Sequence, residues 1–199
     1  MSKILLASNN KSKLAECRAA LSECGYEVVS PFDLGLHIDP EETGTTYREN
    51  SYIKALAFAS ASGLPVISDD SGFEVEALGG RPGLFSSRFA ADYDGDYERA
   101  GRALNDMLGD SPSRKAKFHC CICFLKNPGE EPLYFEADFP GTLLPKSSGH
   151  GGFGYDPYFH SDELDLDMGL ASPEKKNQYS HRAKALKKLV EYLNRAGEQ

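Results

Sequence analysis

The eight residues PVISDDSG (65–72) are the stretch that decides the fold. Pro65 to Ser68 has the apolar character of a buried strand, and two carboxylates, a hydroxyl and a glycine follow it directly. Two adjacent carboxylates at the end of a strand suit a hard cation that prefers oxygen ligands. The same residue types are common in turns, so a structural turn is the alternative. Glu41-Glu42-Thr43-Gly44 has the same two interpretations, a metal-ligand pair or a solvated loop.

Strands and helices are mixed along the chain on both sides of this stretch. The capping box of Thr46 and Glu49 opens a helix that Gly63 ends. The other predicted elements are strands at 4–7, 118–125 and 134–139, a helix after the polar turn 8–13, a helix over 96–108, and a last helix that starts near Ser180. This mixture predicts an α/β or α+β class. Polar motifs lie just after strands, where α/β sheets usually build their sites.

Composition restricts the partners and the compartment. The net charge of −8 argues against a nucleic-acid partner, because such binding needs many uncompensated Lys and Arg side chains. No apolar run is long enough to span a bilayer, and the N-terminal residues are too short an apolar stretch for a signal peptide. The five cysteines are an odd number, and three of them cluster at 120–123. This pattern predicts reduced thiols in the cytoplasm rather than a disulfide framework.

Two polar motifs are candidates for binding phosphate. Ser8, Asn10 and Lys13 lie at a strand-to-helix turn, where a helix N-terminus favours anions. An ordinary helix cap beside a solvated lysine is the alternative. Lys54 lies one helical turn after Asn50, and it either holds a phosphate or is simply exposed.

Two further motifs are candidates for recognising a planar base. Residues 149–156 contain four glycines, which let the backbone approach a ligand, and Phe153 and Tyr155 can stack on a base. A flexible hairpin is the alternative. His181 and Arg182 at the start of the last helix can donate hydrogen bonds to a base carbonyl, or can belong to a solvated helix start.

Two apparent metal motifs do not fit a metal site, one because of its spacing and the other because of strand alternation. Asp92, Asp94 and Asp96 imitate an EF-hand loop, but Gly95 comes too early and the twelfth position is Ala103 instead of a glutamate. The segment 119–123 resembles a zinc cluster, but strand alternation sends Cys120 to the opposite face from its neighbours. Buried, reduced cysteines are the better interpretation.

Taken together, these segments resemble the family of non-canonical purine NTP pyrophosphatases, also called inosine/xanthosine triphosphate pyrophosphatases. The matching motifs run through nearly the whole chain: Ser8-x-Asn10-x-x-Lys13, Glu41-Glu42-Thr43-Gly44, Glu49-Asn50 with Lys54-Ala55, Asp69-Asp70-Ser71-Gly72, Gly79-Gly80-x-Pro82-Gly83, Ser87-Arg88, Gly152-Phe153-Gly154-Tyr155-Asp156-Pro157 and Ser180-His181-Arg182. Asn9 departs from the family pattern, which usually has Gly there, and Lys175 stands where a second acid is common.

The resemblance implies an elongated α/β fold, a single domain over 1–199 with two lobes around a long mixed sheet, a cleft between the lobes, and a homodimer. It implies that Glu41 and Asp70 carry Mg²⁺ and that Asp70 is also the general base. It implies that Phe153 stacks on the base, with Asp156, Lys176, His181 and Arg182 around base and sugar. The implied substrate-binding residues are Ser8, Asn9, Asn10, Lys11, Ser12, Lys13, Lys54, Ser71, Phe153, Gly154, Tyr155, Asp156, Lys176, His181 and Arg182.

The expected reaction is hydrolysis of ITP, dITP or XTP to the monophosphate and pyrophosphate. An ordinary Asp is a poor base for free water, so Asp70 needs a metal ion acting on the same water. A fixed donor accepts the carbonyl at C6 of hypoxanthine or xanthine and opposes the amino group of adenine. Two other functions stay open: a nucleotide sensor that does not hydrolyse, and a pyrophosphatase for modified pyrimidines.

Overall fold

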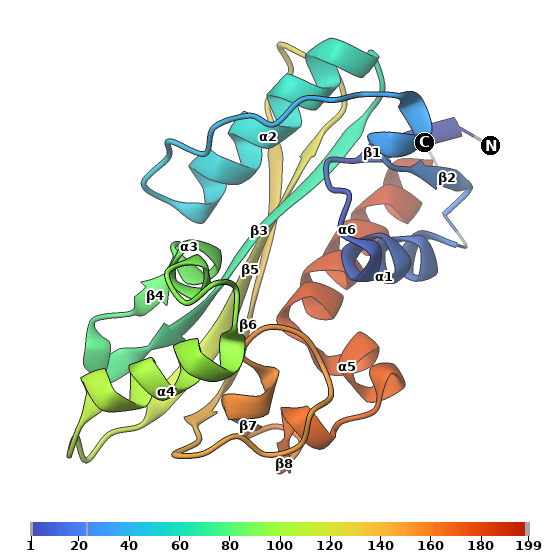
Figure 1. Ribbon diagram of the computed structural model, residues 1–199. Helices are drawn as coiled ribbons and strands as arrows, with labels where there is room; N and C mark the ends of the chain where they lie inside the picture. The colour runs from blue at the N-terminus through green and yellow to red at the C-terminus, as the bar shows by residue number, and fades with distance from the viewer. Residues whose placement is uncertain (1, 23, 198–199) are drawn as a thin grey trace. The chain divides into compact units, whose positions relative to one another are not determined.

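The computed structural model describes residues 2–22 and 24–197 (Figure 1). The strands are β1 (Ser2–Leu6), β2 (Tyr26–Val29), β3 (Val66–Val75), β4 (Arg81–Gly83), β5 (Lys115–Leu125), β6 (Leu133–Leu143), β7 (Phe159–Ser161) and β8 (Leu166–Asp167). The α-helices are α1 (Lys11–Leu21), α2 (Tyr47–Ser62), α3 (Ser86–Ala91), α4 (Tyr97–Leu108), α5 (Pro173–Tyr179) and α6 (His181–Gly197). The short 3₁₀ helices are η1 (Phe32–Leu34), η2 (Glu76–Leu78), η3 (Asp156–Tyr158) and η4 (Met168–Leu170).

One sheet joins the strands in the order β2-β1-β3-β5-β6-β7-β8, and β4 pairs with β3. β1 pairs in parallel with both β2 and β3, so that Leu5 is opposite Val29 on one side and Val66 on the other. The pairs β3/β4, β6/β7 and β7/β8 are antiparallel. Helices connect the parallel strands, as such crossovers require. The predicted α/β class and mixed sheet are therefore confirmed.

The chain divides into two compact units. The first contains the described parts of 1–70, 120–137 and 182–199, and the second contains 71–119 and 138–181. Three strands, β3, β5 and β6, contribute residues to both units. The boundary in β3 falls between Asp70 and Ser71, so the two carboxylates of the motif at 69–72 belong to the first unit.

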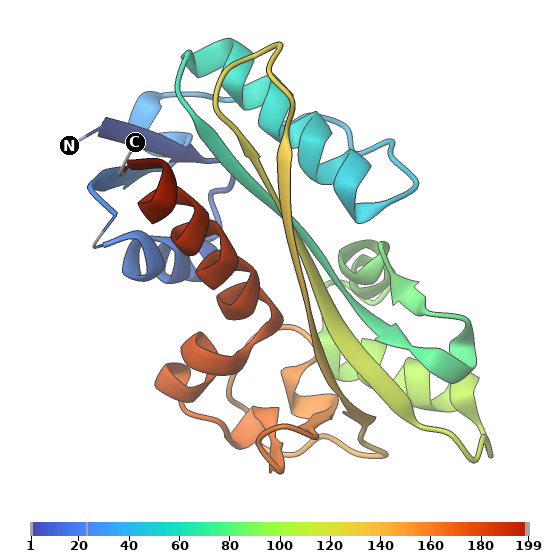
Figure 2. The same cartoon turned by 180° about the vertical axis from the view of Figure 1, so that it is seen from behind.

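The first unit has a hydrophobic cluster on each face of its strands. In β1, Ile4 and Leu6 join one cluster, and Leu5 joins the other, because successive side chains of a strand point to opposite faces. Helices α1 and α6 lie on one side of the strands and α2 lies on the other (Figures 1 and 2). Strands covered on both faces need apolar residues at every position, which explains the continuous run at 4–7.

The second unit is built around a cluster rich in aromatic side chains. Phe73 of β3 contacts Phe118 of β5, with ring centroids 4.8 Å apart, and stacks on Tyr155 at 5.2 Å. Leu104 and Leu108 supply the apolar face of α4 to the same cluster. This core holds the loop that follows β6.

Most predicted elements are present, with one informative difference in β3. The capping box of Thr46 and Glu49 forms as predicted, and Gly63 ends α2 in the left-handed conformation with φ of 65°. However, β3 does not end at Ser68; it continues through Asp69 and Asp70 to Val75. The prediction that the two carboxylates follow the strand is wrong, because they lie inside it. No described helix has the length and apolarity needed to cross a membrane.

Candidate active site

The turn between β1 and α1 is organised by its own side chains. The Oγ of Ser8 accepts a hydrogen bond from the N–H of Asn10 at 3.2 Å. The Oδ1 of Asn10 caps α1 by accepting from the N–H groups of Ser12 and Lys13, at 2.9 and 3.2 Å. The helix cap that was the alternative interpretation is thus present. Lys11 and Ser12 are exposed beside it, at a helix N-terminus that favours an anion.

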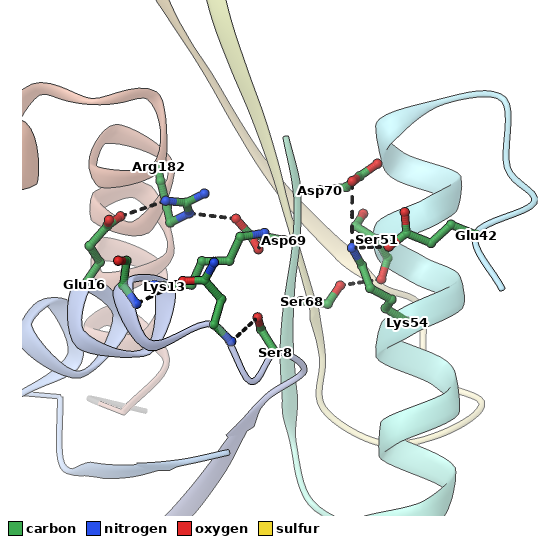
Figure 3. Close-up of polar contacts among 12 residues, drawn as sticks. Ser8, Lys13, Glu16, Glu42, Ser51, Lys54, Ser68, Asp69, Asp70 and Arg182 are labelled. Atoms are coloured by element: carbon green, nitrogen blue, oxygen red, sulfur yellow. Dashed lines mark hydrogen bonds and ion pairs between the residues drawn. The ribbon is translucent and has the colours of Figure 1, made fainter. Parts of the chain in front are cut away.

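Lys13, by contrast, is not the solvated lysine of that alternative. Its Nζ lies 2.6 Å from Oδ1 of Asp69, and the Nε of Arg182 donates to Oδ2 of Asp69 at 2.7 Å. Arg182 also pairs with Glu16, with 3.0 Å between Nη1 and Oε2. Figure 3 shows these four side chains on one side of β3. Arg182 was predicted to donate to a base, but its guanidinium already pairs with two carboxylates.

Asp69 is held as an anion by its two cations. Burial alone would raise its pKa, but Lys13 and Arg182 outweigh the burial and hold the pKa of Asp69 well below its usual 3.8. A carboxylate in this state positions the cations around it and takes up protons poorly. Asp69 is therefore suited to fixing Lys13 and unsuited to acting as a base.

Asp70 points to the other side of β3, toward α2, because it is the next residue along the strand (Figure 3). Its Oδ1 lies 3.7 Å from Nζ of Lys54, which is 2.7 Å from Oε1 of Glu42. Its Oδ2 is buried and has no hydrogen-bond partner among the described residues. Burial is the main cause that raises the pKa of Asp70 to about 6, with Glu42 adding to it and Lys54 opposing it.

Lys54 stays charged in this setting. Burial lowers its pKa, but Asp70, Asp69 and Glu42 outweigh the burial, so the net effect is a raised pKa. The alternative of an exposed lysine is wrong, because the side chain of Lys54 is only 14% exposed. An ammonium group this close to two carboxylates is fixed in position before any ligand arrives.

A pocket of about 350 Å³ in the first unit is lined by Lys13, Lys54 and Asp69, but not by Asp70 or Arg182. Its lining combines the ammonium groups of Lys13 and Lys54 with three carboxylates and the turn after β1. The lining residues are Ala7, Ser8, Asn9, Lys13, Pro31, Ile38, Asp39, Pro40, Glu42, Lys54, Phe58 and Asp69. Such a pocket offers both cations for phosphate oxygens and carboxylates for a metal ion.

The position of Glu41 differs from that of its neighbour. Glu41 is exposed and does not line the pocket, whereas Glu42 lines it and pairs with Lys54. Glu42, and not Glu41, is therefore the acid placed beside Asp70. The described residues contain no group of three or more His, Cys, Asp or Glu side chains arranged to hold a metal ion. A site with two protein carboxylates suits Mg²⁺, which keeps several waters and binds substrate phosphates.

The glycine-rich loop of the second unit presents one aromatic side chain. Phe153 is 52% exposed, with its ring centroid 5.7 Å from that of Tyr97. Asp156 holds the loop by accepting from the N–H of Phe153 at 2.6 Å and by pairing with Lys176. At Gly152, which has φ of 83°, an added Cβ would lie 2.3 Å from Oδ2 of Asp156. That glycine is required by the loop itself.

Other residues of the second unit that were predicted to contact the substrate are buried or half-buried. Tyr155 is 2% exposed, stacks on Phe73 and donates through its hydroxyl to the carbonyl of Ser86 at 3.0 Å. The prediction that the Tyr155 ring stacks on a base is therefore wrong: it is a core residue. His181 is 7% exposed and stacks on Phe118 with 5.0 Å between ring centroids. Ser71 is half-buried in β3, and Gly154 has φ of 66°.

Sequence reasoning missed two acids and one contact. Glu16 shares a face of α1 with Lys13, three residues before it, and this spacing was the available signal. Glu42 was considered only as a partner of Glu41. Asn9 uses its Oδ1 to accept from the N–H of Phe32 at 3.2 Å, which no local pattern indicates.

The fold and the pocket define an α/β protein with a polar pocket lined by two lysines and three carboxylates. The model of the Ham1 family matches residues 4–192, and the chain belongs to this family. A dITP/XTP pyrophosphatase of Photorhabdus laumondii is 39% identical, over 98% of this chain and 100% of the relative. One of Halalkalibacterium halodurans is 41% identical over the same shares of both chains. The structure of a HAM1 protein from Coxiella burnetii superimposes with a TM-score of 0.90 at 35% identity, covering 98% of this chain and 100% of that one.

Proposed function

We propose that this protein hydrolyses non-canonical purine nucleoside triphosphates, namely ITP, dITP and XTP, to the monophosphate and pyrophosphate. Family membership and the names of the relatives support this substrate class. The observation that carries the chemistry is the pocket lined by Lys13, Lys54 and Glu42. Lys54 also approaches Asp70, whose buried Oδ2 lacks a partner among the described residues.

The cations of the pocket bind the substrate, and the carboxylate of Asp70 acts on the attacking water. Lys13, Lys54 and the turn at 8–13 hold the triphosphate oxygens, because a nucleophile approaches a polyanion only after neutralisation. Water attacks the α-phosphorus and gives a proton to Asp70. The bond from the α-phosphorus to the bridging oxygen breaks, and pyrophosphate leaves with the electron pair. A pKa of about 6 makes Asp70 a stronger base than an ordinary Asp, yet leaves it ionised at neutral pH.

Asp70 and Glu42 fit a bound Mg²⁺ ion. The fit rests on the buried Oδ2 of Asp70, which accepts no hydrogen bond from the described residues, and on the all-oxygen chemistry of the pair. When bound, Mg²⁺ supplies neutralisation of phosphate charge and a more acidic water. Glu41 was the acid expected from the motif, and it remains the alternative ligand.

Base recognition is proposed for residues of the second unit and for Arg182. The exposed ring of Phe153 offers a stacking surface, and the pair of Asp156 and Lys176 holds its loop. His181 and Arg182 are the proposed donors to the C6 carbonyl. Because Arg182 already pairs with Asp69 and Glu16, it has to keep those contacts while donating to a base.

We also propose that residues 1–199 act as one domain with two lobes, that the protein is a cytoplasmic homodimer, and that it has no nucleic-acid partner. None of the five cysteines forms a disulfide within the described residues, which supports a reducing compartment. Light scattering after gel filtration would measure the number of subunits.

The test is product analysis over a panel of ITP, dITP, XTP, GTP, ATP and modified pyrimidine triphosphates, with Mg²⁺ or with EDTA. We expect monophosphate and pyrophosphate from the first three, and loss of activity in EDTA. Release of inorganic phosphate with the diphosphate as first product would contradict attack at the α-phosphorus. Tight binding without turnover would indicate a sensor, and preference for pyrimidines would indicate the other enzyme class.

Adjacent acids provide a matched pair for the metal. Glu42→Gln and Glu41→Gln make the same chemical change one residue apart. We expect Glu42→Gln to raise the Mg²⁺ concentration needed for half-maximal activity by about tenfold or more, because loss of even a residue that supports a ligand typically costs about 10–100-fold in metal affinity. The reverse order of the two variants would assign the metal to Glu41.

A further inference from the structure

A buried hydrogen bond joins strand β3 to helix α2 near the Lys54–Asp70 contact. The Oγ of Ser68 donates to the main-chain carbonyl of Ser51 in a short bond. Both serines are 0% exposed. Figure 3 shows Ser68 and Ser51 on the same side of β3 as Lys54 and Asp70. The contact therefore lies in the same strand–helix interface as the proposed base and its lysine.

The spacing along each element explains this placement. Ser68 is two residues before Asp70, and side chains two apart on a strand share a face. Ser51 is three residues before Lys54, and residues three apart on a helix are neighbours on its surface. The bond therefore links the two backbones about one helical turn from the point where Lys54 and Asp70 approach to 3.7 Å.

Helix formation does not require this bond. In an α-helix the carbonyl of residue 51 accepts from the N–H four residues later, so the hydroxyl of Ser68 is a second donor to the same oxygen. Its particular effect is to fix how far α2 lies from β3. A change in this separation would move the base of the Lys54 side chain relative to the Asp70 carboxylate, which lies 3.7 Å from the Lys54 ammonium.

We propose that Ser68 is a positioning residue that sets the placement of Lys54 relative to Asp70. This inference rests on the proposed function, in which Lys54 holds a phosphate and Asp70 takes the proton from water. Ser68 acts through the helix backbone and needs no contact with substrate. The turn that carries Ser8 and Lys13 packs on the other side of β3, so its hold on the triphosphate does not depend on this bond.

Ser51 provides the matched control. Its Oγ donates to the carbonyl of Arg48 at 3.0 Å and lies 3.6 Å from Sγ of Cys121. Ser51→Ala removes those contacts but leaves the carbonyl that accepts from Ser68. Ser68→Ala and Ser51→Ala each delete one buried serine hydroxyl near α2, and only Ser68→Ala breaks the hydrogen bond between β3 and α2.

The experiment measures kcat and KM for ITP, together with Tm, for Ser→Ala and Ser→Cys at both positions. We expect Ser68→Ala to lower kcat by about tenfold, because a misplacement of about 1 Å can cost about 100-fold and a smaller shift costs less, with a much smaller change in KM. Ser68→Cys keeps a weaker donor and should fall between Ser68→Ala and the wild type. Both substitutions at Ser51 should leave kcat within about twofold of the wild type while lowering Tm similarly.

Equal kcat values for the variants at the two positions would overturn the inference, whether kcat falls at both or at neither. If Ser68→Ala does not fold, Ser68→Cys against Ser51→Cys decides in the same way. Failure of the proposed function is a separate result, because the wild-type protein would then release no pyrophosphate from ITP.

Discussion

Replacing Asp70 by Asn should stabilise the folded protein while abolishing turnover. The side chain is buried, its Oδ2 has no partner among the described residues, and Lys54 approaches only to 3.7 Å. Ionisation in this place is unfavourable, because burial raises the pKa of Asp70 from its usual 3.8 to about 6. Asn has nearly the same shape as Asp and stays neutral at every pH.

The magnitude follows from the difference in proton affinity. A pKa that moves from 3.8 to about 6 corresponds to a penalty of about 3 kcal/mol for the ionised form in the folded state, at about 1.4 kcal/mol per tenfold change. Water that enters the pocket and the loss of an acceptor for Lys54 reduce the gain. We therefore expect Asp70→Asn to be more stable than the wild type by about 1–3 kcal/mol at pH 8.

The pH dependence of the stability that Asp70 contributes is opposite to that of most carboxylates in proteins. Between pH 3.8 and about 6, folded Asp70 keeps a proton that the unfolded chain has already lost. The folded state binds more protons, so the stability contributed by this group falls as pH rises through that window. The stability advantage of Asp70→Asn should accordingly be near zero below the lower value and complete above the higher one.

The assay is urea denaturation of both proteins in EDTA at several pH values from 4 to 8. The neighbouring Asp69→Asn is the control of opposite sign. Lys13 and Arg182 hold the pKa of Asp69 down, so its ionised form stabilises the fold above the unfolded pKa and this contribution is lost in acid. Asp69→Asn should lower stability at pH 8 by about 3–5 kcal/mol, because it leaves buried cations without their anion.

Addition of Mg²⁺ should stabilise the wild type and leave Asp70→Asn little changed, because a ligand that binds only the folded state adds its binding free energy to stability. The reasoning about Asp70 would be refuted if Asp70→Asn were less stable than the wild type in EDTA at pH 8, or if the difference between them did not vary with pH.

Two other predictions concern the base and the thiols. Phe153→Ala should lower kcat/KM for ITP and for ATP by similar factors, because stacking, worth about 1–3 kcal/mol, does not depend on the identity of the base; Arg182→Ala should lower ITP use more than ATP use. Equal losses in Arg182→Ala would mean that its guanidinium acts only through Asp69 and Glu16. Cys123→Ser should lower Tm with little loss of activity per folded molecule, since burial raises the pKa of this thiol to about 12 and keeps it unreactive. Stoichiometric zinc in the purified protein would contradict that assignment.

Local patterns predicted the elements whose signals are local. The capping box of Thr46 and Glu49 formed because it depends only on neighbouring residues. The apolar run at 4–7 correctly indicated a first strand, although β1 spans Ser2–Leu6 and is completed by pairing with β2 and β3. The stretch at 69–72 was placed after its strand because Asp, Ser and Gly favour turns. Pairing of Phe73 to Val75 with β4 continues the strand through those residues, and tertiary pairing overrides the local preference.

The availability of side chains was harder to predict than their presence. Phe153 and Tyr155 are two residues apart in one loop, yet the first is 52% exposed and the second 2%. The contact of Tyr155 with Phe73, far away in sequence, decides this, and no pattern within the loop contains it. The same holds for Glu41 and Glu42, which differ only in which one faces Lys54.

The extension of β3 through the acidic pair is also what separates the functions of the two acids. At the end of a strand, adjacent carboxylates can turn toward one ligand, whereas inside a strand they must face opposite sides. Asp69 meets two cations and holds its proton weakly, while Asp70 meets a buried surface and holds its proton more strongly. Groups of one chemical type whose environments push their pKa values apart are typically those with different roles in catalysis. On this argument Asp69 cannot replace Asp70 as the base. The Asp69 carboxylate should therefore support no turnover in Asp70→Asn.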